Sequence, residues 1–157
     1  MILADNNRNT LAKRERINSL KQLEVLFDRS GSLSLSSFPL RVVYRVVARG
    51  ENEPLVQMLI SVPKKHLHRA VKRNKVKRQV RAAYRVNKHG LISYFETVNN
   101  RSAATGKDGN ADSEMKREGV DLAFIWLSDD LYESSVVERR VVNLLDRLQE
   151  RLAKSTN

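Results

Sequence analysis

The spacing of apolar residues changes several times along the chain, and each change marks a predicted element. Apolar side chains recur at helical spacing over residues 18–28, which predicts a short helix. Residues 38–49 and 55–62 are rich in β-branched and aromatic residues and predict two strands that form an antiparallel pair. A continuous apolar run over residues 119–127 predicts a buried strand. Residues 134–154 have the pattern of an amphipathic helix, whose apolar face should cover the sheet.

A further helix is predicted over residues 64–88, with Pro63 just outside its start and Gly90 just past its end. Its apolar face has the spacing i, i+4, i+7 and i+8, at Val76, Val80, Ala83 and Tyr84. A second face has the spacing i, i+4, i+7, i+11 and i+14, at Asn74, Arg78, Arg81, Arg85 and Lys88. One side of this helix can therefore pack while the other points cationic groups outward.

The order of elements predicts an α+β fold in two layers, a split βαβ arrangement. At 157 residues the chain suits one domain, which we expect over residues 17–154. Residues 1–16 are polar and end in basic side chains, so we expect a flexible basic arm. Residues 91–98 either extend the basic helix or form a short turn. Residues 99–118 are rich in Asn, Asp, Gly, Ala and Ser and predict a mobile insertion.

The distribution of charge along the chain indicates a binding function in addition to a fold. The chain carries a formal net charge of +11, and residues 64–88 hold eleven of its 29 Lys and Arg with no Asp or Glu among them. A helix face that is merely solvated usually mixes both signs, because pairs at i,i+4 stabilise it. The one-sign face therefore favours a nucleic acid as partner, with a solvated face as the alternative. The chain has no cysteine and no apolar run of membrane-spanning length, so we expect a cytoplasmic protein and no membrane partner.

Side chains for protein-borne catalysis are sparse. The histidines, His66, His68 and His89, lack a neighbouring Cys or carboxylate at metal-ligand spacing, so we expect no metal site formed by the protein. Asp129 and Asp130 are adjacent, but such pairs at a strand end usually belong to a turn or a helix cap. We therefore expect no catalytic residue in this chain.

The segment Arg73-Asn74-Lys75-Val76-Lys77-Arg78 resembles the Arg-Asn-Arg signature helix of the bacterial ribonuclease P protein subunit. The resemblance extends upstream through residues 61–65 and 70–71, and downstream through Arg81 and Tyr84. It implies the element order α-β-β-β-α-β-α with a left-handed βαβ crossover, although connection rules alone favour a right-handed one. Two departures are Gln57-Met58-Leu59-Ile60, where the family commonly has Arg-x-Gly, and His68-Arg69, where it often has Gly-Asn.

The resemblance also implies a function. In that family a catalytic RNA subunit removes the 5′ leader of precursor tRNA, using Mg²⁺ held mainly by RNA, and the protein is an accessory subunit of this endoribonuclease that binds both RNAs. The residues that would contact the catalytic RNA are Arg73, Asn74, Lys75, Lys77, Arg78 and Arg81, extended by Lys64, Lys65 and Arg69 and, from its place in the basic row, by Arg85.

A cleft for the single-stranded leader is also implied, between the basic helix, the sheet and the first helix. Phe27 matches an aromatic position of that cleft, and Arg16 precedes the first helix. Tyr44 is a further candidate, although a strand tyrosine more often buries its ring in the core. Two other functions stay open: a general RNA-binding or ribosome-binding protein, and a self-sufficient nuclease using Asp121, Asp129 or Asp130.

Overall fold

The computed structural model describes residues 9–105 and 117–155. Five helices and four strands follow one another in this part of the chain: η2 (Lys13–Glu15), α1 (Leu20–Leu26), β1 (Leu33–Ser37), β2 (Leu40–Arg49), β3 (Val56–Ser61), α2 (Ala70–Asn87), α3 (His89–Thr105), β4 (Arg117–Trp126) and α4 (Ser134–Ser155). Apart from the short η2 and the additional α3, this is the order that the resemblance implies. No helix among the described residues is both long and apolar enough to cross a membrane.

The four strands form one sheet in the order β1-β2-β4-β3. β1 and β4 pair antiparallel with the two edges of β2, and β3 pairs parallel with β4. The predicted pairing of β2 with β3 is therefore wrong, because β4 lies between them. The physical reason is burial: residues 119–124 of β4 are buried on both faces, which only a central strand achieves. β3 has partly exposed polar positions and lies at the edge.

β1 is the strand that apolar periodicity missed. The predicted strand began at Phe38, but the chain turns at Phe38-Pro39, a cis peptide bond, and the preceding Leu33–Ser37 forms the other arm of the hairpin. This segment reads Leu-Ser-Leu-Ser-Ser, and of its two leucines Leu35 is buried while Leu33 is exposed. Such a weak pattern gives little signal until β2 supplies the partner edge.

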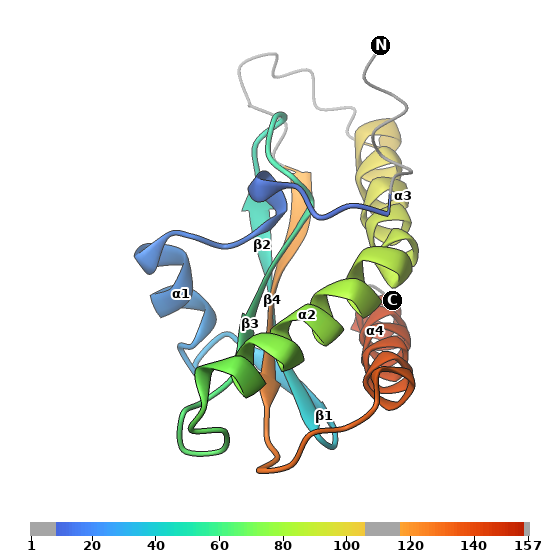
Figure 1. The fold of residues 1–157 in the computed structure, drawn as a ribbon. Coiled ribbons are helices and arrows are strands. Elements are labelled where there is room, and N and C mark those ends of the chain that lie inside the picture. Colours follow the sequence, from blue (N-terminus) through green and yellow to red (C-terminus); the bar gives the residue numbers. More distant parts are fainter. Residues whose placement is uncertain (1–8, 106–116, 156–157) are drawn as a thin grey trace.

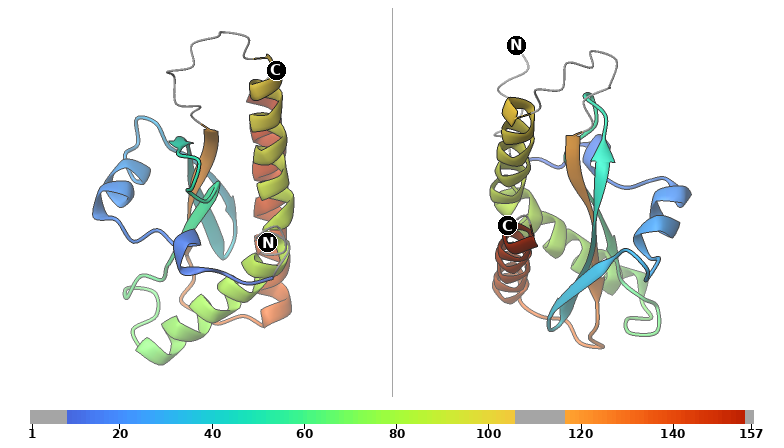
Figure 2. Two further views of the ribbon diagram at one scale, coloured as in Figure 1. Left: turned by 90° about the horizontal axis from the view of Figure 1, so that it is seen from above. Right: turned by 180° about the vertical axis from the view of Figure 1, so that it is seen from behind.

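Helices cover the two faces of the sheet unequally (Figures 1 and 2). α2, α3 and α4 lie on one face over the main core, which contains the fully buried Trp126, Tyr84, Phe95 and Phe124. The predicted apolar face of α4 is confirmed, at Val137, Val141, Leu144, Leu145, Leu148 and Leu152. α1 lies alone on the other face over a small cluster of Ile17, Leu26, Val43 and Ala123.

The crossover from β3 to β4 is left-handed, as the resemblance implies. In Figure 1, β3 lies in front of β4, both strands run downward, and the connection through α2 and α3 passes over the right-hand face. Seen from the side of these helices, with both strands pointing upward, β3 lies on the right and β4 on the left. The chain therefore passes from right to left in front of the sheet, which is a left-handed crossover.

The helices differ from the prediction at their ends. α2 begins at Ala70 and not at residue 64, because residues 64–69 form turns in which the amides of His66 and Leu67 bond to the Pro63 carbonyl. Gly90 does not end a helix but lies within α3, which continues through residues expected in the mobile insertion. That helix carries residues 99–105, and β4 begins at Arg117. The rest of the expected insertion, residues 106–116, lies outside the described residues.

The N-terminal arm also differs from the expectation where it is described. Residues 1–8 lie outside the described residues. Residues 9–17, here called the N-terminal segment, run from the α2–α3 junction across β3 to α1 (Figure 1). Arg16 forms a parallel bridge with Met58 of β3, and the Ile17 amide donates to the Met58 carbonyl at 2.9 Å. This part of the arm is joined to the sheet edge.

Candidate nucleic-acid interface

The basic face of α2 is fixed in place by its opposite face. Val76, Val80, Ala83 and Tyr84 are buried against the sheet and α4, as their spacing predicted. Burial raises the pKa of the Tyr84 hydroxyl far above its usual value, and the nearby Glu15 carboxylate raises it further. The hydroxyl therefore stays protonated. Because the apolar face is held over more than two turns, the cationic side chains on the outer face are presented on a rigid support.

Most of the predicted RNA-binding residues lie on one surface, formed by α2 and the turn before it. The exposed members are Lys64, Lys65, Arg69, Asn74, Lys75 and Arg78. The half-buried members are Arg73, Lys77, Arg81 and Arg85. No Asp or Glu occurs within α2, so the helix itself offers these cations no intrahelical ion pair.

Arg73 is bound within the protein. Its guanidinium Nη1 donates to the carbonyl of Leu67 at 2.9 Å and to that of His68 at 2.7 Å. These contacts tie the first turn of α2 to the turn at residues 64–69. Arg73 therefore helps to shape the surface, and because these two bonds use only Nη1, the prediction that Arg73 contacts RNA through its other donors stays a prediction.

Lys88 does not belong to the outward-facing row. It is 4% exposed, and its ammonium donates to the Thr10 carbonyl and to Glu15 Oε1 at 2.7 Å. The helical period alone assigns Lys88 to the cationic face, but the residue lies at the C-terminal cap of α2 and is buried. The N-terminal segment covers that end of the face, which the pattern within α2 could not reveal.

Three arginines from two elements come close together beside this covered end. The pKa of the Arg81 guanidinium is lowered by burial and then by the positive charges of Arg16 and Arg85. Arg16 lies on the N-terminal segment, whereas the other two are a helical turn apart on α2. We call Arg16, Arg81 and Arg85 the arginine cluster. Its concentrated charge suits an anion, and nothing in local sequence joins Arg16 to it.

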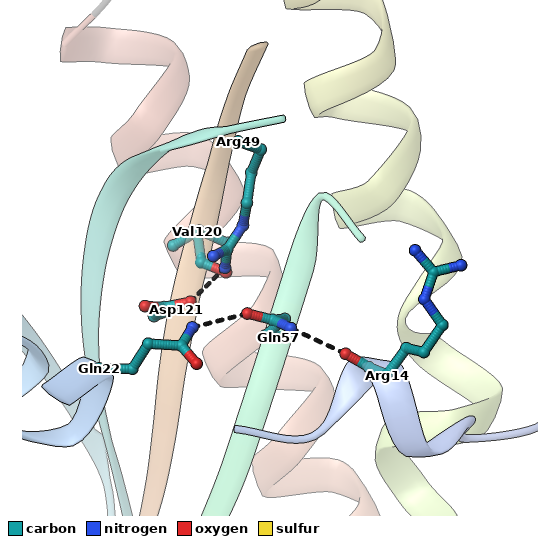
Figure 3. A network of polar contacts seen from close by, with 6 residues as sticks. All are labelled: Arg14, Gln22, Arg49, Gln57, Val120 and Asp121. Carbon is teal, nitrogen blue, oxygen red and sulfur yellow. Dashed lines mark hydrogen bonds and ion pairs between the residues drawn. The ribbon is translucent and has the colours of Figure 1, made fainter. Parts of the chain in front are cut away.

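A groove of about 490 Å³ lies between η2, α1 and the edge of β3. Its basic lining residues are Lys13, Arg14 and Arg16, and its neutral polar ones include Asn18, Ser19, Gln22 and Gln57. Figure 3 shows how Gln57 joins the walls: its Oε1 accepts from Gln22 at 2.7 Å, and its Nε2 donates to the Arg14 carbonyl at 2.8 Å. Sequence reasoning missed Gln22, named Arg14 only as part of the basic N-terminal arm, and marked Gln57 only as a departure from the family pattern.

The three leader-cleft candidates do not lie together. Arg16 is exposed at the groove, and Phe27 is 45% exposed at the C-terminal end of α1. Tyr44 is 2% exposed and packs in the main core, on the face of the sheet opposite α1. Tyr44 is therefore a core residue and not a cleft residue, because position 44 of β2 points toward the helices while positions 43 and 45 point toward α1.

Of the carboxylates considered for a nuclease, Asp121 lies within β4, apart from the adjacent Asp129 and Asp130, which follow that strand. Asp121 is buried at 3% exposure and pairs with Arg49, which also donates to the Val120 carbonyl (Figure 3). Asp129 is exposed and contacts His66 at 2.8 Å. Within residues 9–105 and 117–155, no group of three or more His, Asp or Glu side chains is placed to hold a metal ion. The geometry favours a binding surface over a protein-borne hydrolytic centre.

Comparisons with known proteins show which family this sequence and fold resemble. The family model of ribonuclease P matches residues 11–120. The ribonuclease P protein components of two Porphyromonas gingivalis strains, ATCC 33277 and W83, are each 33% identical over 138 residues, covering 88% of this chain and 85% of the relative. That of Blochmanniella floridana is 25% identical, covering 71% of this chain and 89% of the relative. The solved ribonuclease P protein from Thermotoga maritima has the same fold, with a TM-score of 0.54, 21% identity and coverage of 85% of this chain and 96% of that one.

Proposed function

The chain belongs to the ribonuclease P protein family, and we propose that it holds the catalytic RNA of that enzyme on the outer face of α2. The family acts in tRNA 5′-end maturation as the protein component of an endoribonuclease whose catalytic centre lies in RNA. The observation that carries the proposal is the rigid, one-sign face of α2, presented by residues 74–85 together with the turn at 64–69.

Phosphate binding follows from the chemistry of this face. Exposed Lys75 and Arg78 can approach phosphate oxygens directly, and the guanidinium can bridge two oxygens. Arg69 and Lys65 extend the surface past the helix start. Because α2 is buried along its other side, these cations lose little backbone freedom when RNA binds, which lowers the cost of association.

Precursor tRNA is the second proposed partner, and its single-stranded leader would follow the α1 face. The groove beside η2 offers cationic side chains for the backbone, and Phe27 offers an exposed ring on which a base can stack. The groove and Phe27 lie at opposite ends of α1, so a single-stranded leader would have to run along this helix to reach both. Since tRNA precursors are made in the bacterial cytoplasm, we place the protein there.

The Mg²⁺ ions of the holoenzyme fit RNA better than this chain. Mg²⁺ prefers hard oxygen ligands in octahedral geometry, and the described residues do not gather carboxylates into such a set. We propose that the protein supports these ions indirectly, by neutralising phosphates and holding the RNA.

A salt titration of RNA binding tests the proposal. Each phosphate that the protein neutralises releases counterions, so log affinity should fall linearly with log salt concentration. A Lys75→Ala/Arg78→Ala variant should reduce that slope by about 2, because it removes two phosphate contacts. The matched control, Arg139→Ala/Arg140→Ala on exposed positions of α4, loses the same charge and should keep the slope. Equal slopes for wild type and the α2 variant would refute this interface.

A further inference from the structure

The N-terminal segment is attached to the domain at both of its ends. At the β3 side, Gln57 donates to the Arg14 carbonyl at 2.8 Å, and Ile17 donates to Met58. At the α2–α3 junction, His89 Nε2 contacts Asn9 Oδ1 at 2.7 Å, and Lys88 binds both the Thr10 carbonyl and Glu15. The segment is therefore held across the end of α2.

The Lys88–Glu15 pair is the charged contact in this set. The Lys88 side chain is 5% exposed and that of Glu15 is 16% exposed, with 2.7 Å between Nζ and Oε1. Removing either partner leaves a largely buried charge unpaired, which is unfavourable for the closed arrangement. The pair thus makes the position of residues 10–15 depend on an electrostatic contact with α2.

This position brings like charges together. Glu15 contacts Lys88 at 2.7 Å, and Arg16 directly follows Glu15, so Arg16 lies at the end of α2 that carries Arg81 and Arg85. Burial, and then the positive charges of Arg16 and Arg85, lower the pKa of the Arg81 guanidinium. Arg81, Arg85 and Lys88 have the spacing i, i+4 and i+7 and share one side of α2. The positive charges on this side repel Arg16, which the backbone bridge to Met58 alone would have to hold in place without a further anchor. Glu15 supplies the opposite charge, and it contacts the cation at the end of the row.

We propose that Lys88 and Glu15 form a latch that positions Arg16 beside Arg81 and Arg85, so that an RNA phosphate is bound by arginines from two elements. Lys88 and Glu15 are positioning residues, since their charged groups are turned inward and do not reach RNA. That the bound ligand is RNA rests on the proposed function. The contact that holds the N-terminal segment against α2 does not depend on RNA.

Two measurements separate the latch from a general loss of stability. The first is hydrogen exchange at the Ile17 amide, which donates to Met58 in the closed segment, with the Leu148 amide of buried α4 as reference. Lys88→Met should accelerate exchange at Ile17 at least several-fold and leave Leu148 unchanged. Glu15→Gln should act in the same direction, and Lys88→Arg, which retains the charge, should restore slow exchange at Ile17.

The second measurement is a double-mutant cycle on affinity for the catalytic RNA. Arg16→Ala should weaken binding about tenfold, the effect of one lost charge-assisted hydrogen bond, and Lys88→Met should match it. The double variant should bind no more weakly than the poorer single variant, because the latch acts through Arg16. Lys154→Met, an exposed lysine near the end of α4, is the charge-matched control and should leave affinity unchanged.

The outcomes are distinguishable. Additive losses in the cycle, or unchanged exchange at Ile17 in both Lys88→Met and Glu15→Gln, would overturn the latch. Should Lys88→Met fail to fold, Glu15→Gln alone decides the same question. If wild-type protein fails to bind the RNA, the proposed function falls, and exchange at Ile17 then still decides whether Lys88 holds the segment closed.

Discussion

Arg73 and Arg78 look equivalent in the sequence, but replacing each with alanine should show that Arg73 stabilises the fold and that Arg78 contributes mainly to RNA binding. Arg73 donates to two backbone carbonyls of the turn before α2, at 2.9 and 2.7 Å. Hydrogen bonds from charged groups contribute about 1.5–3 kcal/mol, and one of these two is solvent-exposed, so Arg73→Ala should cost roughly 1–3 kcal/mol of folding free energy. Arg78 is exposed, and its loss should cost about 0–1 kcal/mol.

Thermal unfolding measures this difference directly. For a chain of this size, 1 kcal/mol shifts Tm by about 2–4 °C, so Arg73→Ala should lower Tm by roughly 2–12 °C. Arg78→Ala should move it by less than about 4 °C. Both variants should weaken RNA binding, Arg78→Ala by losing a phosphate contact and Arg73→Ala by loosening residues 64–69. Equal Tm values for the two variants would refute the structural role of Arg73.

Three further outcomes follow from burial. Leu148→Ala should destabilise the fold by about 2–5 kcal/mol in a denaturant titration, because Leu148 is fully buried between α4 and the sheet; no change would show that α4 does not cover the core. Asp121→Ala should cost about 3–5 kcal/mol in the same assay by leaving buried Arg49 unpaired, and a wild-type midpoint would contradict the pairing. Tyr44→Phe should leave leader affinity and stability nearly unchanged, since the Tyr44 hydroxyl is buried without a partner among the described residues. Phe27→Ala should weaken binding of a leader oligonucleotide, because it removes an exposed ring on which a base can stack. A larger loss of leader affinity in Tyr44→Phe than in Phe27→Ala would restore Tyr44 to the cleft.

Apolar periodicity located α1, β2, β3, β4, α2 and α4, because one-sided burial leaves its period in the sequence, but it did not locate α3. It could not give the strand order. β2 and β3 are consecutive and joined by a short connection, which favours a hairpin, but the doubly buried β4 displaces that pairing. The position of β4 follows from tertiary burial and not from any neighbour in sequence.

In the candidate site, too, local sequence pattern predicted some features, while contacts between distant residues determined the others. The charge row of α2 was visible from its spacing, and Arg78 and Lys75 are exposed as expected. Lys88 belongs to that row by period, yet an ion pair with Glu15, 73 positions away, turns it inward. The position of Arg16 beside Arg81 depends on that same contact. Long-range polar partners of this kind have no period and leave no local signal.

Cleavage of precursor tRNA at low Mg²⁺ tests the central claim, that the outer face of α2 holds the catalytic RNA. The assay compares the cognate catalytic RNA alone, with wild-type protein, and with a folded Lys75→Ala/Arg78→Ala/Arg81→Ala variant. We predict that wild-type protein stimulates removal of the 5′ leader, that the variant stimulates weakly, and that added Mg²⁺ narrows the gap, because divalent ions replace part of the lost neutralisation. Wild-type stimulation by the folded variant, or cleavage by the protein without RNA, would contradict the account.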